Sequence, residues 1–578
     1  MSTDMQYESK HKRFDPGHGR NVPESRSARN PWLRSLYVKT ATAQIPRLLT
    51  MVDTNPFQNT YGCFDRNYWH YRTADFPSGM YQESVLSLAL VWAHRFPGNH
   101  WYQHPRIREL ALAGMRFTVR SAHDDGSCDD YYPFERALGA TVFSLYATIE
   151  AYLLCDSYDP EILDGLEKRA LWLVNNDETG QLTNHQAWAV ISLFRMYQLT
   201  GNAKFLAASE VRWRTVLNWQ SSEGWFLEYG GCDPGYLSVT IDALAKYYLL
   251  TNDPIVYESL QRAVTFARYF LHPDNTFGGH YGSRGTCHFY PHGMEILATT
   301  NKNASELAEG FLQSLAQNQA AAFDDDRLYT HRLPNLIQAY LQGQQHGEAS
   351  LVEEVAGTSQ GCTSLPDEWD RYFPEAQVYV HRSSESYGVV SCAKGGTFKI
   401  FQKETPCVSD SGLIFEMEDG RICVMHMQEK REVTIDEDRL SVRGTMHWVH
   451  HETATPLKQI LFRLGMGIWG RRKSQVVRKV LQRRLIAGRR ESPVRFQRTI
   501  RWGAAVEVID VVELLDRKLE VRRGAISSDA NSIYTAAGHV FQSDEFSSWV
   551  DLNKQVRELN RTGRTVIRRV FHARGSCD

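Results

Sequence analysis

The chain has 578 residues, of which 42% are hydrophobic and 12% aromatic, so it is long enough to bury the cores of two domains. Its formal net charge of −2 argues against a general affinity for nucleic acid. The ten cysteines include no CxxC pair and no run of eighteen apolar residues occurs, so we expect reduced thiols and no membrane-spanning helix.

Residues 1–30 are polar and basic and contain no apolar stretch of the kind found in a secretory signal. We therefore expect a disordered N-terminal tail and a cytoplasmic protein.

Residues 31–347 carry a helical pattern, in which apolar residues recur every three or four positions between Gly, Pro or Asn-Asp breaks. The clearest segments are residues 83–96, 140–154, 184–200, 237–251, 258–271 and 332–342. The spacing gives about a dozen helices, or about six hairpins, without a heptad seam. We predict an (α/α) toroid for residues 31–347.

An acidic segment, HDDGSCDDYYPFER, occupies residues 123–136. Its oxygen-bearing side chains lack the regular spacing of a calcium loop. We expect Tyr131, Tyr132, Glu135 and Arg136 to contact a glycan; the alternative is a solvated turn followed by a helix start.

Three polar and aromatic segments follow. TNHQAWAV contains Asn184 and His185, EGWFLEYGGCDPGYLS runs from Glu223 to Ser238, and FGGHYGSRGTCHFYPHGME runs from Phe277 to Glu295. They place amide, imidazole, phenol and guanidinium groups on loops or helix ends, and such groups bind sugars and transfer protons. The pattern predicts a carbohydrate-active site.

Beyond residue 347 the composition changes to alternating apolar and polar residues rich in Val, Ile and Thr. The alternating segments are residues 379–402, 411–428, 431–451, 504–515 and 565–575. We predict a linker at 348–370 and an antiparallel β-sandwich at 371–578.

A basic insert, Lys458–Arg490, interrupts the strand-rich half with many Lys and Arg, no acidic residue and interleaved apolar side chains. This pattern is typical of an amphipathic helix or ribbon on an anionic membrane, or of a groove for an acidic polymer. The alternative is a solvated helical insert packed on the sandwich. Membrane contact would place the protein at the inner face of the membrane.

Four motifs in the same order resemble the heparinase II/III-like polysaccharide lyases, in particular those of bacterial exopolysaccharide clusters. They are DGSCDDYYPFERALGATVFS (Asp125–Ser144), the Asn184-His185 pair followed by QA, EYGGCDPGYLS, and HFYPHGME. That family joins an (α/α) toroid to a β-sandwich. Many members carry a histidine-rich, Asp-containing motif at the start of the sandwich, but here the corresponding region reads SESYGVVSCAKGGTFKI. His426, His447, His450 and His451 lie further on and do not align with that motif.

The resemblance implies β-elimination on a uronate-containing acidic polysaccharide, with no metal or other cofactor. The enzyme removes the C5 proton and protonates the departing O4. Asn184 and His185 would neutralise the uronate carboxylate, since an amide, an imidazole and a helix N-terminus all favour an anion. The alternative is that Asn184 is an N-cap and His185 a satisfied helix-end histidine.

Tyr236 is the predicted base and acid, assisted by Arg284 and His288. Tyr229 is the second candidate for this role, and the alternative for Tyr236 is packing over the Asp-Pro-Gly turn. Further aromatic or polar residues of the three segments are expected to contact substrate: Trp188, Tyr229, Asp233, His280, Tyr281, Tyr290 and His292. The spacing HX7HX3H from His280 lacks a nearby Cys or firm acidic ligand, so we expect no metal site.

Two other functions remain open at this point. A glycoside hydrolase would use paired carboxylates, with Asp130 or Glu135 opposite Asp233. A non-catalytic glycan-binding or polysaccharide-assembly protein would need no proton transfer at all. The sequence leaves the sugar, the mode of cutting and the oligomeric state open.

Overall fold

The structure is a computed structural model that describes residues 31–178, 180–320, 326–349, 368–403, 405–427, 430–449, 455–470, 490–527 and 549–572. The predicted tail lies outside these ranges, as do most of the predicted linker and residues 471–489 of the basic insert.

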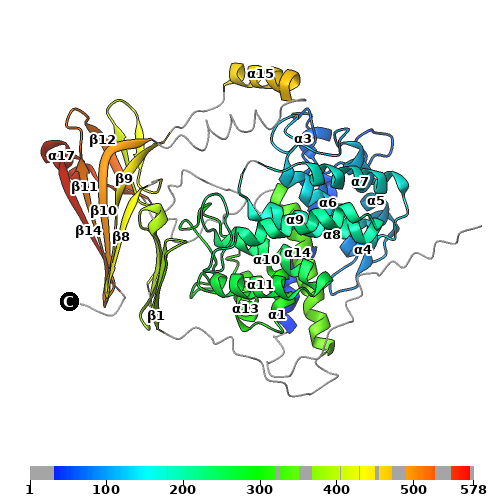
Figure 1. The fold of residues 1–578 in the computed structure, drawn as a ribbon, viewed down its shortest axis with the longest axis horizontal. Coiled ribbons are helices and arrows are strands. Elements are labelled where there is room, and N and C mark those ends of the chain that lie inside the picture. Colours follow the sequence, from blue (N-terminus) through cyan, green and yellow to red (C-terminus); the bar gives the residue numbers. More distant parts are fainter. Residues whose placement is uncertain are drawn as a thin grey trace, which may run out of the picture.

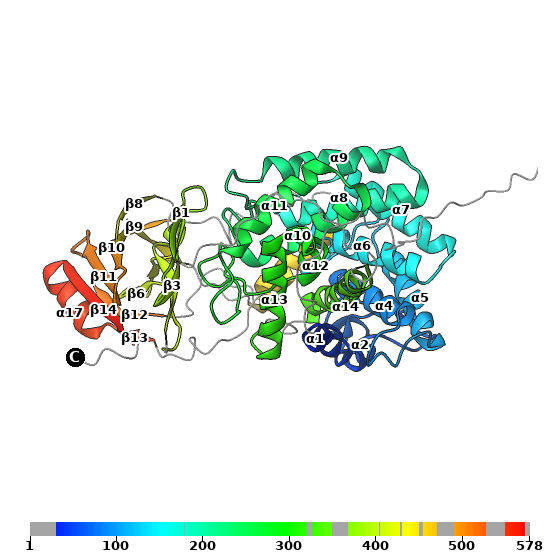
Figure 2. The same ribbon diagram turned by 90° about the horizontal axis from the view of Figure 1, so that it is seen from below.

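The N-terminal part of the chain is helical (Figures 1 and 2). Its helices are α1 (Pro31–Thr42), α2 (Ile45–Met51), α3 (Arg66–Trp69), η1 (Met80–Glu83), α4 (Ser84–Ala93), α5 (Pro105–Arg120), α6 (Leu138–Leu154), α7 (Pro160–Asn175), α8 (Thr183–Thr200), α9 (Ala203–Asn218), α10 (Pro234–Thr251), α11 (Pro254–Arg268), α12 (Pro291–Leu297), α13 (Lys302–Ala316) and α14 (Asp326–Ala349).

The helices form two layers. Helices α4, α6, α8, α10, α12 and α14 contact one another in that order, and α14 contacts α4, so the inner layer closes on itself. Helices α5, α7, α9, α11, α13 and α1 each pack on the outside of an inner helix. Burial follows this arrangement, since α6 and α10 are buried almost all round whereas α5 and α11 bury one face.

Asp-Pro pairs start three of these helices. Asp159, Asp233 and Asp253 accept a backbone N–H of the first turn of α7, α10 and α11, and the following proline occupies the first helical position. The cap at Asp233 fixes the backbone that carries Tyr236.

The C-terminal part folds into antiparallel sheets, as the alternating sequence predicted. The strands are β1 (Trp369–Phe373), β2 (Val378–Arg382), β3 (Ser386–Ser391), β4 (Thr397–Gln402), β5 (Val408–Asp410), β6 (Leu413–Met417), β7 (Ile422–Val424), β8 (Arg431–Asp436), β9 (Arg439–Val449), β10 (Glu491–Arg501), β11 (Ala505–Leu514), β12 (Val521–Ile526), β13 (Val550–Asp551) and β14 (Arg564–His572). Within the described residues, β1 to β5 form one sheet in chain order, and the second sheet runs β13-β12-β6-β7-β9-β10-β11-β14 with β8 on β9.

The smaller sheet lies between the helices and the larger sheet (Figures 1 and 2). One of its faces, including Val380 and Val389, belongs to the same hydrophobic core as the helices. Its other face, including Phe398 and Ile400, packs against β9, β10 and β11. Helix α17 (Asn553–Thr562) covers the outside of the larger sheet.

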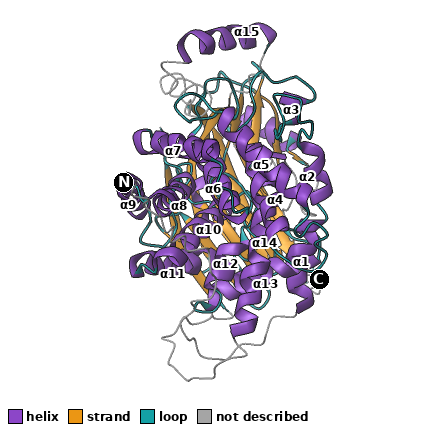
Figure 3. Cartoon of the chain, turned by 90° about the vertical axis from the view of Figure 1, so that its right-hand side faces the viewer, coloured by secondary structure: helices purple, strands orange, loops and turns teal. Residues whose placement is uncertain are grey.

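The insert between β9 and β10 begins with helix α15 (Pro456–Gly465) and a π-helical turn, η3 (Met466–Gly470). Figures 1 and 3 show α15 at the edge of the molecule, beside the helical part. No helix in the described ranges is long and apolar enough to cross a membrane.

Candidate functional site

Asn184 stands at the start of α8 and is held by a carboxylate from the second polar segment. Its backbone N–H donates to Oε2 of Glu228 at 3.1 Å and its side-chain amide to Oε1 at 2.7 Å. Both residues are buried. Burial raises the pKa of the Glu228 carboxyl well above its usual value, and the two donors from Asn184 oppose that shift. Glu228 therefore orients the Asn184 amide, a role that the sequence alone did not indicate.

His185 points to a different carboxylate. Its Nδ1 lies 2.9 Å from Oε1 of Glu178, and its ring meets Phe143 edge-on with the centroids 5.7 Å apart. Gly139 leaves room for the imidazole, because a Cβ there would come within 3 Å of the ring. The His185 side chain stays 17% exposed. A carboxylate on Nδ1 fixes one tautomer and leaves Nε2 as the accepting nitrogen of a neutral ring.

Tyr236 lies in the first turn of α10 and is partly exposed. Its ring centroid is 5.3 Å from that of Tyr229 and 5.0 Å from that of His288. Tyr229 has a φ of 54°, in the left-handed region, and hydrogen-bonds to Tyr236. Burial raises the pKa of the Tyr236 phenol, against the opposing charge of Arg284 and the hydrogen bond from Tyr229. The phenol is therefore protonated at neutral pH.

The third polar segment brings Arg284 and His288 to the same tyrosines. Asp233, the cap of α10, also accepts the backbone N–H of Arg284 at 2.8 Å. The Arg284 guanidinium carbon lies 4.2 Å from the Tyr229 ring centroid. His288 is buried beneath Tyr236, and burial lowers the pKa of its imidazole well below the ordinary value, so the ring is neutral. Tyr236, Tyr229, Arg284 and His288 thus form one cluster.

The sheets also contribute to this region. Lys394, in the short helix η2 (Cys392–Lys394), donates through Nζ to the backbone oxygens of His280 at 2.6 Å and Gly282 at 2.8 Å. The pKa of Lys394 is lowered to about 8, mainly by burial; the charge of Asp233 opposes this shift and that of Arg284 adds to it. Lys394 belongs to the segment SESYGVVSCAKGGTFKI, so this segment brings a lysine from the sheets to the third polar segment.

His426 is the second contribution of the sheets. Its Nδ1 lies 3.1 Å from the backbone oxygen of Ser411. Burial lowers the pKa of the His426 imidazole to about 3, and the charges of Lys394 and of His280 act in the same direction. The burial of His426 and its contact with Ser411 are features that no local sequence pattern indicates.

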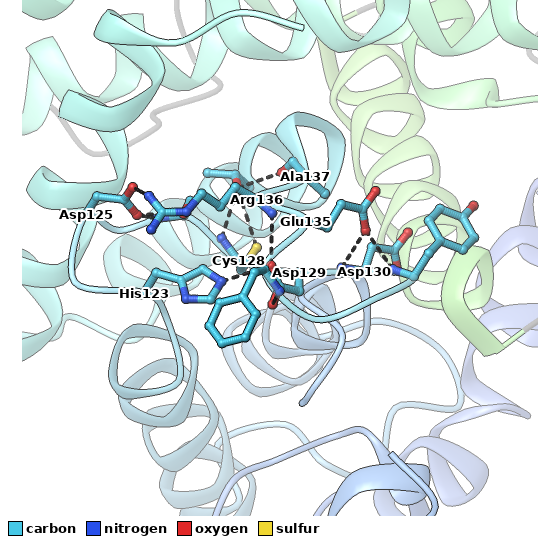
Figure 4. Close-up of polar contacts among 12 residues, drawn as sticks. His123, Asp125, Cys128, Asp129, Asp130, Glu135, Arg136 and Ala137 are labelled. Atoms are coloured by element: carbon cyan, nitrogen blue, oxygen red, sulfur yellow. Dashed lines mark hydrogen bonds and ion pairs between the residues drawn. The ribbon is translucent and has the colours of Figure 1, made fainter. Parts of the chain in front are cut away.

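In the acidic loop, side-chain carboxylates accept backbone N–H groups of the same loop (Figure 4). Glu135 accepts the N–H groups of Asp130 and Tyr131, at 3.2 and 2.8 Å. Asp129 accepts those of Phe134 and Arg136, at 2.7 and 2.9 Å. Arg136 also pairs with Asp125, and Asp130 accepts the Ser78 hydroxyl at 2.7 Å. Tyr131 is exposed, whereas the Tyr132 ring contacts Phe462 of α15. These contacts fit the turn that we considered as the alternative for this segment.

Four predicted substrate contacts lie instead in the core. Trp188 is 2% exposed, with its ring centroid 4.7 Å from that of Tyr146. Tyr281 pairs through its hydroxyl with Nε2 of His272 at 2.9 Å. Tyr290 and His292 are also buried. All four side chains are packed among other residues of the helical part, and their contact with a substrate stays a prediction.

Among the described residues, no three His, Cys, Asp or Glu side chains converge as metal ligands would. Of the five predicted catalytic residues, His185, Tyr236 and Arg284 are partly exposed, whereas Asn184 and His288 are buried. These residues thus supply a partly exposed imidazole, phenol and guanidinium, together with a buried amide and a buried neutral imidazole.

No protein-family model and no curated protein match the chain. Solved structures do share its fold. Chondroitin AC lyase from Streptomyces coelicolor A3, in complex with chondroitin sulphate, has a TM-score of 0.52 and 9% identity, over 88% of this chain and 70% of that one. Xanthan lyase from Paenibacillus has a TM-score of 0.49 and 8% identity over 87% of this chain, which spans only 47% of that lyase. A mutant heparan sulfate lyase from Pedobacter heparinus has a TM-score of 0.39 and 12% identity, over 87% and 71% of the two chains. The chain therefore shares its overall fold, helices followed by antiparallel sheets, with that chondroitin AC lyase.

Proposed function

We propose that the protein is a heparinase II/III-like polysaccharide lyase that cleaves a uronate-containing polysaccharide by β-elimination, in bacterial exopolysaccharide metabolism. The observation that carries the proposal is the cluster around Tyr236. A partly exposed phenol contacts a second tyrosine and a neutral histidine, and an arginine lies against the second tyrosine. The two-layered helical ring, which we interpret as an (α/α) toroid, and the fold shared with chondroitin AC lyase support it.

The reaction needs three groups from the protein. A base takes the C5 proton, the C5 electron pair forms the C4–C5 double bond, the C4–O4 bond breaks, and an acid gives a proton to O4. A cation or strong donor on the carboxylate stabilises the negative charge that develops as C5 loses its proton. No water, metal or other co-reactant enters this balance.

Arg284 and Asn184 are the groups that we assign to the uronate carboxylate. Arg284 is partly exposed and can bind a carboxylate through two parallel N–H bonds. Asn184 is oriented by Glu228, which takes one of its two side-chain amide hydrogens and leaves the other for the substrate.

In this proposal two residues share the proton transfer. Tyr236 holds its proton at neutral pH because burial raises the pKa of the phenol, so we assign it to the protonation of O4. We assign the removal of the C5 proton to His185, whose contact with Glu178 leaves Nε2 free to accept. The sequence analysis gave both steps to Tyr236. Buried His288 positions Tyr236 from below through its ring contact.

The hydrolase alternative finds less support. Asp233 accepts the backbone N–H groups of Tyr236 and Arg284 and the hydroxyl of Thr286, and Glu135 accepts two backbone N–H groups of its own loop. These carboxylates stabilise local structure, whereas a hydrolase needs one carboxyl group free to donate a proton and another free to accept one.

The test is incubation of the purified protein with a panel of uronate polysaccharides. Ultraviolet absorbance of the new double bond, rising together with reducing ends, is the expected result. Reducing ends without absorbance would mean hydrolysis and overturn the proposal. Neither signal on a panel that includes the native polymer would favour a glycan-binding or assembly protein.

A further inference from the structure

Helix α15 carries apolar side chains on two opposite faces. One face packs on the helical part of the protein, where the Phe462 ring meets that of Tyr132 at 5.3 Å between centroids and Met466 in η3 is buried. Between these two side chains along the helix, Arg463 pairs with Asp75. These contacts fix which side of α15 turns outward.

The outward side is an apolar stripe. It consists of Leu457, Ile460, Leu461, Leu464 and Ile468, all of which are exposed. The first four stand at i, i+3, i+4 and i+7, so they share one helix face. Single exposed hydrophobic residues are normal on a protein surface, but four on one face of α15 and a fifth in the adjoining η3 mark a binding surface.

Charge identifies the partner. Residues 458–490 include eleven Lys or Arg and no Asp or Glu. An acidic protein groove or polymer would satisfy the charge but would leave the stripe in water. A bilayer with anionic headgroups satisfies both, since the apolar face enters the acyl boundary while basic residues remain among the headgroups.

We propose that α15 and η3 dock the protein on an anionic lipid bilayer through the apolar stripe. The docking surface is separate from the residues assigned to catalysis, and the proposal does not depend on the lyase reaction. It gives the basic insert a role in placing the protein at a membrane, in a chain whose described helices include none that could cross one.

Co-sedimentation of the full chain with vesicles tests the proposal. We expect binding to phosphatidylcholine vesicles that contain phosphatidylglycerol, much weaker binding to pure phosphatidylcholine vesicles, and weakening as salt is added. Leu461→Ser/Leu464→Ser should lower the partition coefficient at least about tenfold. The matched control is Val211→Ser/Ile255→Ser, because Val211 and Ile255 are 62% and 53% exposed and Leu461 and Leu464 are 61% and 58% exposed.

Three results would overturn the proposal. The first is that the native chain does not bind anionic vesicles. The second is that the stripe variant binds as tightly as the control variant. The third is that the stripe variant abolishes a dimer, seen by analytical ultracentrifugation, while vesicle binding is absent, which would identify a second copy of the chain as the occupant. Circular dichroism and melting curves show that both variants are folded.

Discussion

Asn184 binds Glu228 through two donors, its backbone N–H at 3.1 Å and its side-chain amide at 2.7 Å. This contact joins the first polar segment to the second across 44 residues of sequence. It fixes the amide at the start of α8 before any substrate is present.

Substitutions of Asn184 and of Glu228 should each destabilise the protein, and their two effects should be coupled. Asn184→Ala leaves the buried Glu228 carboxyl with only the backbone N–H donor at position 184, and Glu228→Ala leaves the buried Asn184 amide without its acceptor. Each should therefore lower the free energy of unfolding by about 1–3 kcal/mol. In the double variant the losses should be less than additive, with a coupling of about 0.5–3 kcal/mol. Urea denaturation of the four proteins measures this; additive losses would contradict the pairing.

Tyr236→Phe removes the phenolic proton and keeps the ring contacts with Tyr229 and His288. We expect kcat to fall by at least about 100-fold while KM changes little. Tyr229→Phe is the control, since it removes only the hydrogen bond to Tyr236 and should cost less. Full turnover in Tyr236→Phe would reject its assignment as the acid.

The charge of Lys394 should be lost within an accessible pH range. Because its folded-state pKa is about 8, below the ordinary 10.5, the folded protein releases this proton before the unfolded chain does. The burial penalty of the charged form is present below about pH 8 and is relieved between pH 8 and 10.5. Relative to Lys394→Met, the native protein should therefore gain up to about 3 kcal/mol of stability as pH rises through this range. Unfolding free energies at pH 7 and pH 10 check this; an equal difference at both would contradict it.

Acid should destabilise the protein through its buried histidines. His426 has a folded-state pKa of about 3, so between pH 6.5 and pH 3 the unfolded chain binds a proton that the folded chain does not. The free energy of unfolding should fall by up to about 1.4 kcal/mol per pH unit from this residue. His426→Asn should show a shallower pH dependence between pH 6.5 and 5. Exposed His100 provides the control substitution, and an unchanged slope in His426→Asn would count against the burial argument.

Arg498 should be a large single contributor to the stability of the sheets. Fully buried, it donates to both oxygens of Asp510 at 2.6 and 2.9 Å and to Asp410 at 2.9 Å. Arg498→Met would remove a positive charge and its hydrogen bonds from two buried carboxylates. It should lower the free energy of unfolding by about 3–5 kcal/mol. The exposed Arg421 and Asp419 pair is the comparison, since solvent screens their charges and Arg421→Met should cost much less than Arg498→Met. Thermal melts distinguish the two; equal losses would refute the role of burial.

Sequence periodicity located much of the fold because it is a local signal. The segments at 140–154 and 237–251 correspond to α6 and α10, and alternation at 504–515 corresponds to β11. Periodicity does not indicate which face of a helix or strand packs against which other element. The order of the larger sheet and the position of the smaller sheet against the helices depend on contacts between distant segments.

The site was predictable to the same extent. Its motifs placed Tyr236, Arg284 and His288 on neighbouring segments, and the structure brings these three to one cluster with Tyr229. Residue type did not indicate that Trp188 and Tyr281 are buried, because an aromatic side chain suits a sugar ring and a protein core equally well. Lys394 was missed because its role depends on a contact over more than a hundred residues of sequence.

The smaller sheet has a consequence for how the chain can be divided. Its inner face completes the hydrophobic core of the helices, and Phe373 meets the rings of Phe266 and Tyr269 at 4.9 and 5.0 Å. A protein ended at the predicted linker would leave that core open to water along one side. We therefore expect the helices and the smaller sheet to melt as one cooperative unit, and a shortened version of the protein to need β1 to β5 to remain soluble.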